Sequence, residues 1–210
     1  IDAMLPALVD IGRDLGVKRA NSNQLVVSLL FAGMVLGQVF YGPLSDQVGR
    51  KPAIYVGLSI FIIGCILSML AKTLPVLLLG RVLQGLGTAG PRIVTTALIR
   101  DLYTGRSMAK VMSFVMTFFI LVPIVAPFIG QGIMLISHWR AIFGVFLVLA
   151  VATTFWFAIR QKETLPVTQR IRFSWTKLTQ ILPDIFFNKV VLGYTITIGL
   201  VMGAFLGYLN

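Results

Sequence analysis

A series of long apolar stretches without charged side chains constrains this chain more than any other feature. A helix crosses the hydrocarbon core of a bilayer with about 20 apolar residues. Six stretches reach that length, one of them interrupted only by Arg81 and Arg92; they cover residues 20–45, 52–71, 73–99, 111–139, 141–159 and 190–210. Residues 1–9 are apolar but too short for a span. The pattern therefore predicts six membrane-spanning helices that follow the end of an incomplete first helix.

The composition favours the same class of protein and argues against others. Hydrophobic residues make up 57% of the 210 residues and charged residues 12%, whereas a soluble domain carries about 25% charged residues. The formal net charge is +11, but the cations lie mostly between the apolar stretches, so they indicate membrane topology and not nucleic-acid binding. The single histidine, His138, has no second metal ligand near it, and no nucleophile–base pair or phosphate-binding loop is evident. We therefore expect no enzymatic activity, no cofactor and no metal site.

The distribution of lysine and arginine predicts which loops face the cytoplasm. Loops 46–51, 100–110 and 160–189 hold eleven of these cations, and the loops between them hold five. Cytoplasmic loops carry an excess of lysine and arginine. The first set is therefore assigned to the cytoplasmic side of the membrane, and the alternating loops to the outside.

This topology divides the chain into three parts. We expect an N-terminal six-helix bundle at residues 1–160 with its first helix incomplete, a basic cytoplasmic linker at 161–188, and the start of a second bundle at 189–210. Both ends of the sequence are interpreted as cut. Within the linker, aromatic and aliphatic side chains between Phe173 and Leu182 are mixed with cations. Two interpretations stay open for that segment: a short amphipathic helix at the membrane surface or a solvated connector.

Five polar or small residues in the stretch 73–99 share one helix face; they are Arg81, Gln84, Gly85, Thr88 and Arg92. On insertion scales a charged residue at the bilayer centre costs about 2.5–3.5 kcal/mol. This face is therefore expected to line the interior of the bundle or a water-filled cavity. The alternative is that Arg81 and Arg92 each extend toward the nearer membrane surface.

Asp2 is a further charged residue within an apolar stretch. Burial would favour the protonated form of its carboxylate, unless a cation such as Arg81 offsets that effect. A carboxylate in this setting can bind and release a proton, so we expect Asp2 to pair with Arg81 and to carry the coupled proton. The alternative is that Asp2 is the edge of a truncated loop.

Glycine and proline residues mark two of the expected spans. Gly33 and Gly37 are four residues apart, a spacing that lets another helix approach closely. Pro123 and Pro127, followed by Gly130, interrupt the backbone hydrogen bonding of the stretch 111–139. Both a helix that bends during function and a helix with a static kink fit this second pattern.

The segment from Gly42 to Pro52, GPLSDQVGRKP, is the most specific motif in the chain. Its glycines and prolines predict a tight cytoplasmic turn, in which Asp46 caps or pairs and Arg50 and Lys51 anchor the turn on the inside. The segment resembles the signature G-x-L-x-D-x-x-G-R-[KR] between helices two and three of the major facilitator superfamily, and the match is nearly complete.

Other segments resemble the same superfamily in the same order. Residues 81–87, RVLQGLG, resemble its R-x-x-Q-G-x-G motif in helix four. Residues 126–131, APFIGQ, resemble the antiporter motif G-P-x-x-G-G of helix five except at Ala126 and Gln131. Four more segments resemble the Bcr/CflA-type branch of proton-coupled drug exporters; they are residues 5–8, 100–102, 139–143 and 163–166.

The resemblance implies an all-α, polytopic membrane protein with the major facilitator fold. That fold has two six-helix halves, each built from 3+3 inverted repeats, with the substrate site between the halves near the bilayer midplane. This chain would supply the N-terminal half and the start of helix seven, truncated at both ends.

The resemblance also assigns roles to individual residues. The pair expected to couple proton binding to transport is Asp2 and Arg81. The residues expected to face the substrate cavity are Gln84, Gly85, Thr88 and Arg92. The residues expected to bend helix five are Pro123, Pro127 and Gly130. The residues expected to form the cytoplasmic gate, with Arg50 paired to both aspartates, are Gly42, Asp46, Gly49, Arg50, Lys51 and Asp101.

The function implied by the resemblance is proton-coupled efflux of drugs or other small lipophilic compounds across the bacterial inner membrane by alternating access. The proton gradient would supply the energy. The expected partners are the small-molecule substrate, the lipid bilayer and the C-terminal half of the same protein, in a monomer. Two alternatives stay open: a nutrient or metabolite symporter or facilitator of the same fold, because importers share the loop signature, and a non-transporting truncated fragment.

Overall fold

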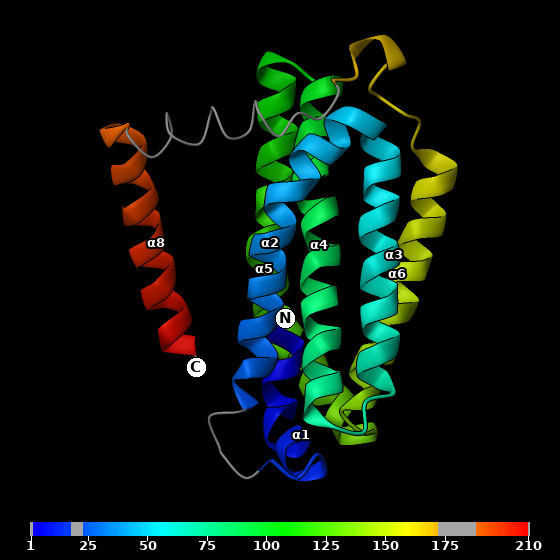
Figure 1. The fold of residues 1–210 in the computed structure, drawn as a ribbon, viewed down its shortest axis with the longest axis vertical. Coiled ribbons are helices and arrows are strands. Elements are labelled where there is room, and N and C mark those ends of the chain that lie inside the picture. Colours follow the sequence, from blue (N-terminus) through cyan, green and yellow to red (C-terminus); the bar gives the residue numbers. More distant parts are fainter. Residues whose placement is uncertain (1, 18–22, 172–187, 210) are drawn as a thin grey trace. The chain divides into compact units, whose positions relative to one another are not determined.

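The computed structural model describes residues 2–17, 23–171 and 188–209. These residues form helices joined by turns and coil (Figure 1). In chain order the 3₁₀ helices (η) and α-helices are η1 (Asp2–Ala7), α1 (Leu8–Asp14), α2 (Leu25–Val48), α3 (Arg50–Met69), α4 (Leu74–Leu102), α5 (Gly105–Ile136), α6 (Arg140–Arg160), η3 (Val167–Gln169) and α8 (Lys189–Leu209). The chain forms two compact units, Ile1–Ile171 and Arg172–Asn210, and each is described by itself.

Four of the five long helices in the first unit are long and apolar enough to cross a bilayer. Among the described residues, four helices qualify by length and composition; they are α2, α3, α5 and α6. Helix α4 has 29 residues, about 43 Å at 1.5 Å per residue, and it contains Arg81 and Arg92. The prediction of an all-α, multi-span membrane fold is confirmed by these helices.

Helix α4 packs closely against both α2 and α3 because glycines lie at the contacts. A Cβ atom at Gly33 of α2 would overlap the carbonyl oxygen of Val82, and one at Gly85 of α4 would overlap the carbonyl oxygen of Leu30. On the other side of α4, a Cβ atom at Gly64 of α3 would lie 2.8 Å from the backbone nitrogen of Gln84. The close approach expected from the Gly33–Gly37 spacing is therefore present, and α4 is its partner.

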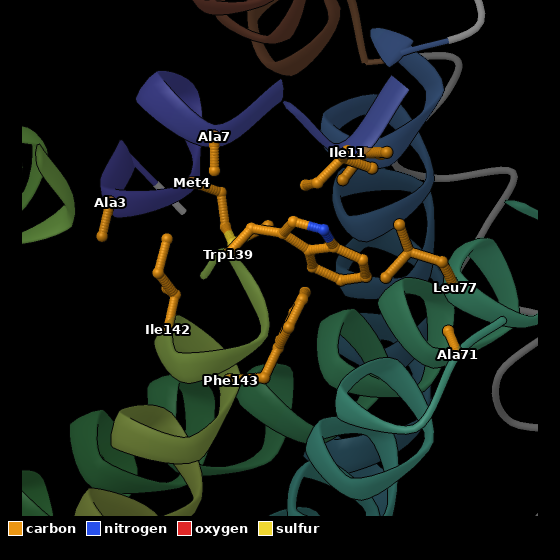
Figure 2. Close-up of a cluster of buried hydrophobic side chains, with 10 residues drawn as sticks. Ala3, Met4, Ala7, Ile11, Ala71, Leu77, Trp139, Ile142 and Phe143 are labelled. Carbon is orange, nitrogen blue, oxygen red and sulfur yellow. The ribbon is translucent and has the colours of Figure 1, made fainter. Parts of the chain in front are cut away.

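A buried apolar cluster ties the short N-terminal helices to the bundle. Figure 2 shows the side chains of Met4, Ile11, Leu77 and Phe143 around the ring of Trp139. Trp139 is 2% exposed and meets Phe143 edge to face, with ring centroids 6.1 Å apart. The cluster combines side chains from η1, α1, α4 and the start of α6, so residues far apart in sequence share one core at this end of the bundle.

Gly130 brings η1 directly against α5. A Cβ atom at Gly130 would overlap the carbonyl oxygen of Ala3, so only glycine allows this backbone contact. Helix α5 is continuous from Gly105 to Ile136 and contains Pro123 and Pro127. The role of these prolines as a functional bend stays a prediction.

The turn between α2 and α3 differs in part from the sequence prediction. Helix α2 continues through Gly42 and Pro43 to Val48, and the chain reverses at Gly49 alone, which has φ 108°. A proline inside a helix lacks a backbone N–H and strains the preceding turn, but membrane-spanning helices tolerate it where neighbouring groups bond the freed carbonyl. The expected tight turn is therefore present within the predicted loop 46–51, at Gly49, whose positive φ favours glycine, whereas Gly42 and Pro43 lie inside α2.

The second unit contains α8, which corresponds to the expected seventh helix. Asn188 caps its first turn, because the Asn188 side-chain oxygen accepts hydrogen bonds from the backbone N–H groups of Val190 (3.0 Å) and Val191 (3.3 Å). The interpretation of residues 173–182 as an amphipathic helix or a solvated connector falls outside the described residues.

Replacing Gly85 with Ala tests the packing of α4 on α2. The added methyl group would overlap the Leu30 carbonyl, so we expect G85A to destabilise the full-length protein by about 1–3 kcal/mol through overpacking. Thermal unfolding in detergent, followed by tryptophan fluorescence, measures the change. G132A is the matched control, because a Cβ atom at Gly132 of α5 has no neighbour within 4 Å. Equal melting temperatures for the two variants would contradict the close packing.

Candidate functional site

One arginine at the end of the bundle that carries the α2–α3 turn joins three helices. Arg50 is the first residue of α3, and its side chain is 10% exposed. Its Nη1 donates to Asp46 Oδ1 of α2 at 2.5 Å and to Ser45 Oγ at 2.8 Å, and its Nε donates to Asp101 Oδ2 of α4 at 3.0 Å. The ion pairs expected of Arg50 with both aspartates are therefore present. We call Asp46, Arg50 and Asp101 the cytoplasmic network, after the side of the membrane that the sequence predicts for them.

Glu163 adds a carboxylate that the sequence prediction left out of this site. Its Oε1 accepts from the backbone N–H of Arg50 at 2.9 Å, and its Oε2 accepts from that of Lys51 at 3.1 Å. The carboxylate therefore caps the N-terminus of α3, where unpaired N–H groups and the helix dipole favour a negative charge. Thr164, the next residue, donates from Oγ1 to Asp101 Oδ2 at 3.2 Å.

Gly49 is required at this site for two reasons. Its φ of 108° lies in the region that favours glycine. A Cβ atom there would also lie 2.6 Å from Glu163 Oε2 and 3.0 Å from Arg170 Nη2. The backbone of Ile171 donates to the Asp46 carbonyl oxygen at 3.0 Å. The chain that follows α6 therefore lies directly on the α2–α3 turn.

Hydrogen bonding keeps Glu163 in its charged form. Burial is the largest single influence, and it raises the pKa of the carboxyl group. Hydrogen bonds from four backbone N–H groups together outweigh it; the donors are Leu165, Arg50, Lys51 and Thr164. The pKa of Glu163 therefore lies below its ordinary value of 4.5.

The remaining gate residues predicted from the sequence have different surroundings. Lys51 donates from Nζ to the carbonyl oxygen of Ala158 on α6 at 3.0 Å. Gly42 lies inside α2, where its carbonyl oxygen accepts from Ser45 Oγ at 2.9 Å. The structure thus brings together all of the predicted gate residues except Gly42, which lies one turn earlier.

Arg81 is buried in the bundle, and the acceptors of its hydrogen bonds are neutral groups. It is 1% exposed. Its Nε donates to the Val26 carbonyl oxygen of α2 at 3.0 Å, and its Nη1 donates to Gln84 Oε1 at 2.7 Å. Gln84 in turn donates from Nε2 to Ser68 Oγ (3.1 Å) and the Gly64 carbonyl oxygen (3.2 Å) of α3. Arg81 and Gln84 thereby connect α2, α3 and α4.

The expected ion pair between Asp2 and Arg81 is not among the contacts of the described residues, and this part of the prediction is corrected. Two donors of Arg81 already bond to Val26 and Gln84. Asp2 lies at the start of η1, and the next two residues, Ala3 and Met4, occupy the buried positions. Arg81 Nη2 is buried and has no acceptor within the part of the chain that the structure describes.

The residues expected to face the substrate cavity divide into two groups. Gln84 and Gly85 are buried between α4 and its neighbours, so they line the interior of the bundle, which is one of the two surroundings expected of this helix face, and not an open substrate cavity. Thr88 is partly buried and donates to carbonyl oxygens of its own helix. Arg92 is exposed, with its guanidinium carbon 5.7 Å from the ring centroid of Phe119 on α5.

A second polar cluster lies at the opposite end of the bundle. Asp14 Oδ2 accepts from Trp139 Nε1 and from Arg140 Nη1, both at 3.0 Å. Arg140 Nη2 also donates to the carbonyl oxygen of Ala71 at 3.0 Å. The Trp139 hydrogen bond first and the Arg140 hydrogen bond second hold the pKa of Asp14 below its ordinary value of 3.8. The adjacent Trp139 and Arg140 were the sequence signal for this cluster, but Asp14 was not predicted as their acceptor.

Long apolar helices, ionic clusters at the helix ends and an arginine buried in the bundle define a polytopic α-helical membrane protein. The chain belongs to the Major Facilitator Superfamily, because the model of that family matches residues 1–210. Proteins of this superfamily are transporters and not enzymes.

Curated relatives cover the whole chain or most of it. The chain is 29% identical over 212 residues to the uncharacterized MFS-type transporter YdgK of Bacillus subtilis (strain 168), covering 100% of this chain and 52% of that protein. It is 36% identical over 163 residues to Multidrug resistance protein D of Escherichia coli (strain K12), covering 78% and 41%. It is 31% identical over 202 residues to Multidrug resistance protein MdtL of Escherichia coli O81 (strain ED1a), covering 96% and 51%. The chain thus spans about half the length of the curated relatives it matches.

A solved structure shares the fold. The crystal structure of the human organic anion transporter MFSD10 (TETRAN) matches with a TM-score of 0.63 and 18% sequence identity, covering 83% of this chain and 42% of that chain. At this identity the likeness shows the all-α major facilitator fold.

Replacing Glu163 with Gln tests whether its charge caps α3. Because the folded-state pKa is lowered, the charge stabilises the fold above the ordinary pKa of 4.5, and this contribution is lost as pH falls through the folded-state pKa. We expect E163Q to melt below the wild-type full-length protein near neutral pH. The difference should shrink as the pH falls below 4.5. Unfolding followed by fluorescence in detergent measures it, and a difference that is constant with pH would contradict the capping role.

Proposed function

We propose that this chain forms the N-terminal half of an exporter that moves small lipophilic compounds out across the bacterial inner membrane in exchange for protons. The observation that carries the proposal is the cytoplasmic network, in which Arg50 joins the ends of α2, α3 and α4. Two relatives at 36% and 31% identity are named multidrug resistance proteins, which supports drugs as the substrate class.

The network has the physical properties of a reversible gate. Partly exposed ion pairs contribute about 0–1 kcal/mol each, so a few of them hold one conformation without making it permanent. Asp46 is 47% exposed and Asp101 24% exposed at the side chain, so both carboxylates are accessible to a second half of the transporter. In the proposed cycle the network is intact when the cytoplasmic side is closed, and it rearranges when that side opens.

Asp2 is proposed as the proton carrier and Arg81 as the residue that responds to it. Asp2 begins η1, which contacts α5 at Gly130 and the Trp139 cluster of α6. A movement of η1 caused by protonation of Asp2 would therefore act on α5 and α6, two helices of the second repeat. Arg81 Nη2 has a free donor among the described residues, which an acceptor occupies in another conformation of the proposed cycle.

Coupling requires that the proton binds one conformation more tightly than the other. A ligand with equal affinity for both conformations shifts nothing. A tenfold difference in proton affinity between the outward-facing and inward-facing states supplies about 1.4 kcal/mol. Protonation from outside then favours release of the compound, and loss of the proton inside favours its binding.

Replacing Asp2 with Asn removes the proposed proton site. We expect D2N to slow proton-driven efflux by about tenfold or more, because a coupling free energy of about 1.4 kcal/mol corresponds to a tenfold change. Substrate binding should be retained. Everted membrane vesicles with the full-length transporter and a panel of cationic, neutral and anionic lipophilic compounds measure both.

The matched control is D10N, which removes a carboxylate on α1 that pairs only with the exposed Arg13 at 3.8 Å among the described residues. D10N should leave efflux near the wild-type rate. Efflux by D2N at the wild-type rate would remove Asp2 from the mechanism, and equal losses in both variants would point to a structural defect.

A further inference from the structure

The cytoplasmic half of α4 carries two arginines on the face between α2 and α5. Arg92, Thr96 and Arg100 are spaced by four residues, so they lie along one helix face. Together with Gln38 of α2 they supply the polar lining of a hollow of about 350 Å³. The two arginines are eight residues apart, which is about 12 Å along the helix.

Arg92 lies well inside the expected span. It is ten residues before the end of α4 at Leu102, about 15 Å at 1.5 Å per residue. A charge at the bilayer centre costs about 2.5–3.5 kcal/mol on insertion scales, so Arg92 requires water or an anion at this depth. Its described neighbours supply neither: Nη1 lies 3.3 Å from Met34 Sδ, and the guanidinium faces the ring of Phe119.

The carboxylates of the described residues do not neutralise this hollow. Among those residues, ion pairs involve the cations Arg13, Arg50 and Arg140. Asp101, the sequence neighbour of Arg100, pairs with Arg50 instead. The hollow's lining contains two arginines and no acidic side chain. It is therefore electropositive, and it repels cations.

The side chains around Arg92 match a particular kind of ligand. A guanidinium presents a planar fork of donors that fits a carboxylate, sulfonate or phosphate group. Phe119 and Met34 offer an aromatic ring and an adaptable thioether to an apolar body. Gln38 and Thr96 provide neutral hydrogen-bonding groups beside the cations. The combination suits an acidic group attached to a lipophilic body.

We infer that this hollow is a subsite for the acidic group of amphiphilic anions, so that lipophilic organic acids are among the compounds the transporter binds. The substrate part of this inference rests on the proposed function. The same chemistry has two sources, a transported organic acid or the headgroup of an anionic phospholipid in the cytoplasmic leaflet. Arg92 is the main anchor, and Arg100 extends the positive surface toward the cytoplasm.

Three probes that share one ring system test the charge preference. They are 9-anthracenecarboxylate, 9-anthracenemethanol and 9-(aminomethyl)anthracene, which are anionic, neutral and cationic near neutral pH. The full-length transporter is placed in phosphatidylcholine nanodiscs, and binding is measured by equilibrium dialysis against empty nanodiscs. The variants are R92Q, R92K and R100Q. The control is R106Q, because Arg106 is an exposed cation in the first turn of α5 and is not part of the hollow.

The expected binding preferences of the three probes follow from the charge-assisted hydrogen bonds that Arg92 can make to a carboxylate. We expect wild type to bind the carboxylate about tenfold tighter than the alcohol, and R92Q to lose that preference, since such bonds are worth about 1.5–3 kcal/mol. R92K should retain part of the preference, R100Q should weaken it, and R106Q should match wild type. Unchanged carboxylate binding in a folded R92Q protein would overturn the inference. Equal losses for all three probes would also overturn it and would assign Arg92 to contacts between the halves.

A second arm separates the two sources of the anion. Phosphatidylglycerol is added to the nanodiscs. If phosphatidylglycerol competes with 9-anthracenecarboxylate in wild type but not in R92Q, a lipid headgroup occupies the hollow. If the lipid leaves binding of 9-anthracenecarboxylate unchanged, the occupant is the organic acid. Failure of the proposed function has a different signature. In that case vesicles show no proton-driven efflux of any probe, although Arg92-dependent binding of the carboxylate remains.

Discussion

An arginine buried among membrane-spanning helices must find its hydrogen-bond acceptors inside the protein, and the rest of this bundle depends on how Arg81 does so. Its guanidinium bonds to the Val26 carbonyl oxygen of α2 and to Gln84, which bonds in turn to α3. Those acceptors are within reach only because glycines at the helix contacts let the backbones approach closely. Polar bonding and close packing therefore require each other, and they hold α2, α3 and α4 together as one block.

The two ends of the bundle are built differently from this middle. At one end Asp14 joins Trp139 and Arg140, and at the other Arg50 joins Asp46 and Asp101. These groups are partly exposed, so each contact is weak and reversible compared with the buried bonds of Arg81. In the proposed cycle the ends open and close in alternation while the block keeps its internal packing.

Much of the fold could be predicted from the sequence, because the hydrophobicity that indicates a spanning helix is a property of one continuous stretch of residues. A charge-free stretch of about 20 residues has few alternatives to a spanning helix. The expected spans correspond to helices α2 to α6 and α8, and among the described residues α2, α3, α5 and α6 are long and apolar enough to cross a membrane. The Arg50 pairs were also predictable, from a motif with a specific pattern. The α2–α3 turn was predicted within residues 46–51 and lies at Gly49, but the sequence pattern did not show that α2 extends through Pro43 to Val48.

The choice of long-range partners could not be predicted from sequence. Glu163 caps the start of α3 from 113 residues away in the chain, and its only signal was a resemblance in the segment 163–166. Asp2 was expected to pair with Arg81 because both are charged residues in apolar stretches. The packing instead gives Arg81 neutral acceptors that are nearer. Which of several suitable groups a buried donor meets is decided by helix contacts, which the sequence pattern does not specify.

In the proposed transport cycle, substrate and protons move in opposite directions. Liposomes that contain the full-length transporter and an internal pH indicator measure this exchange. A substrate gradient, directed inward, is imposed without any pH gradient, using a compound that the vesicle panel identifies as transported. Under proton exchange, substrate entry drives protons out, so the interior becomes more alkaline. Acidification would show symport and an unchanged pH would show uniport, and either result would rule out proton-coupled export.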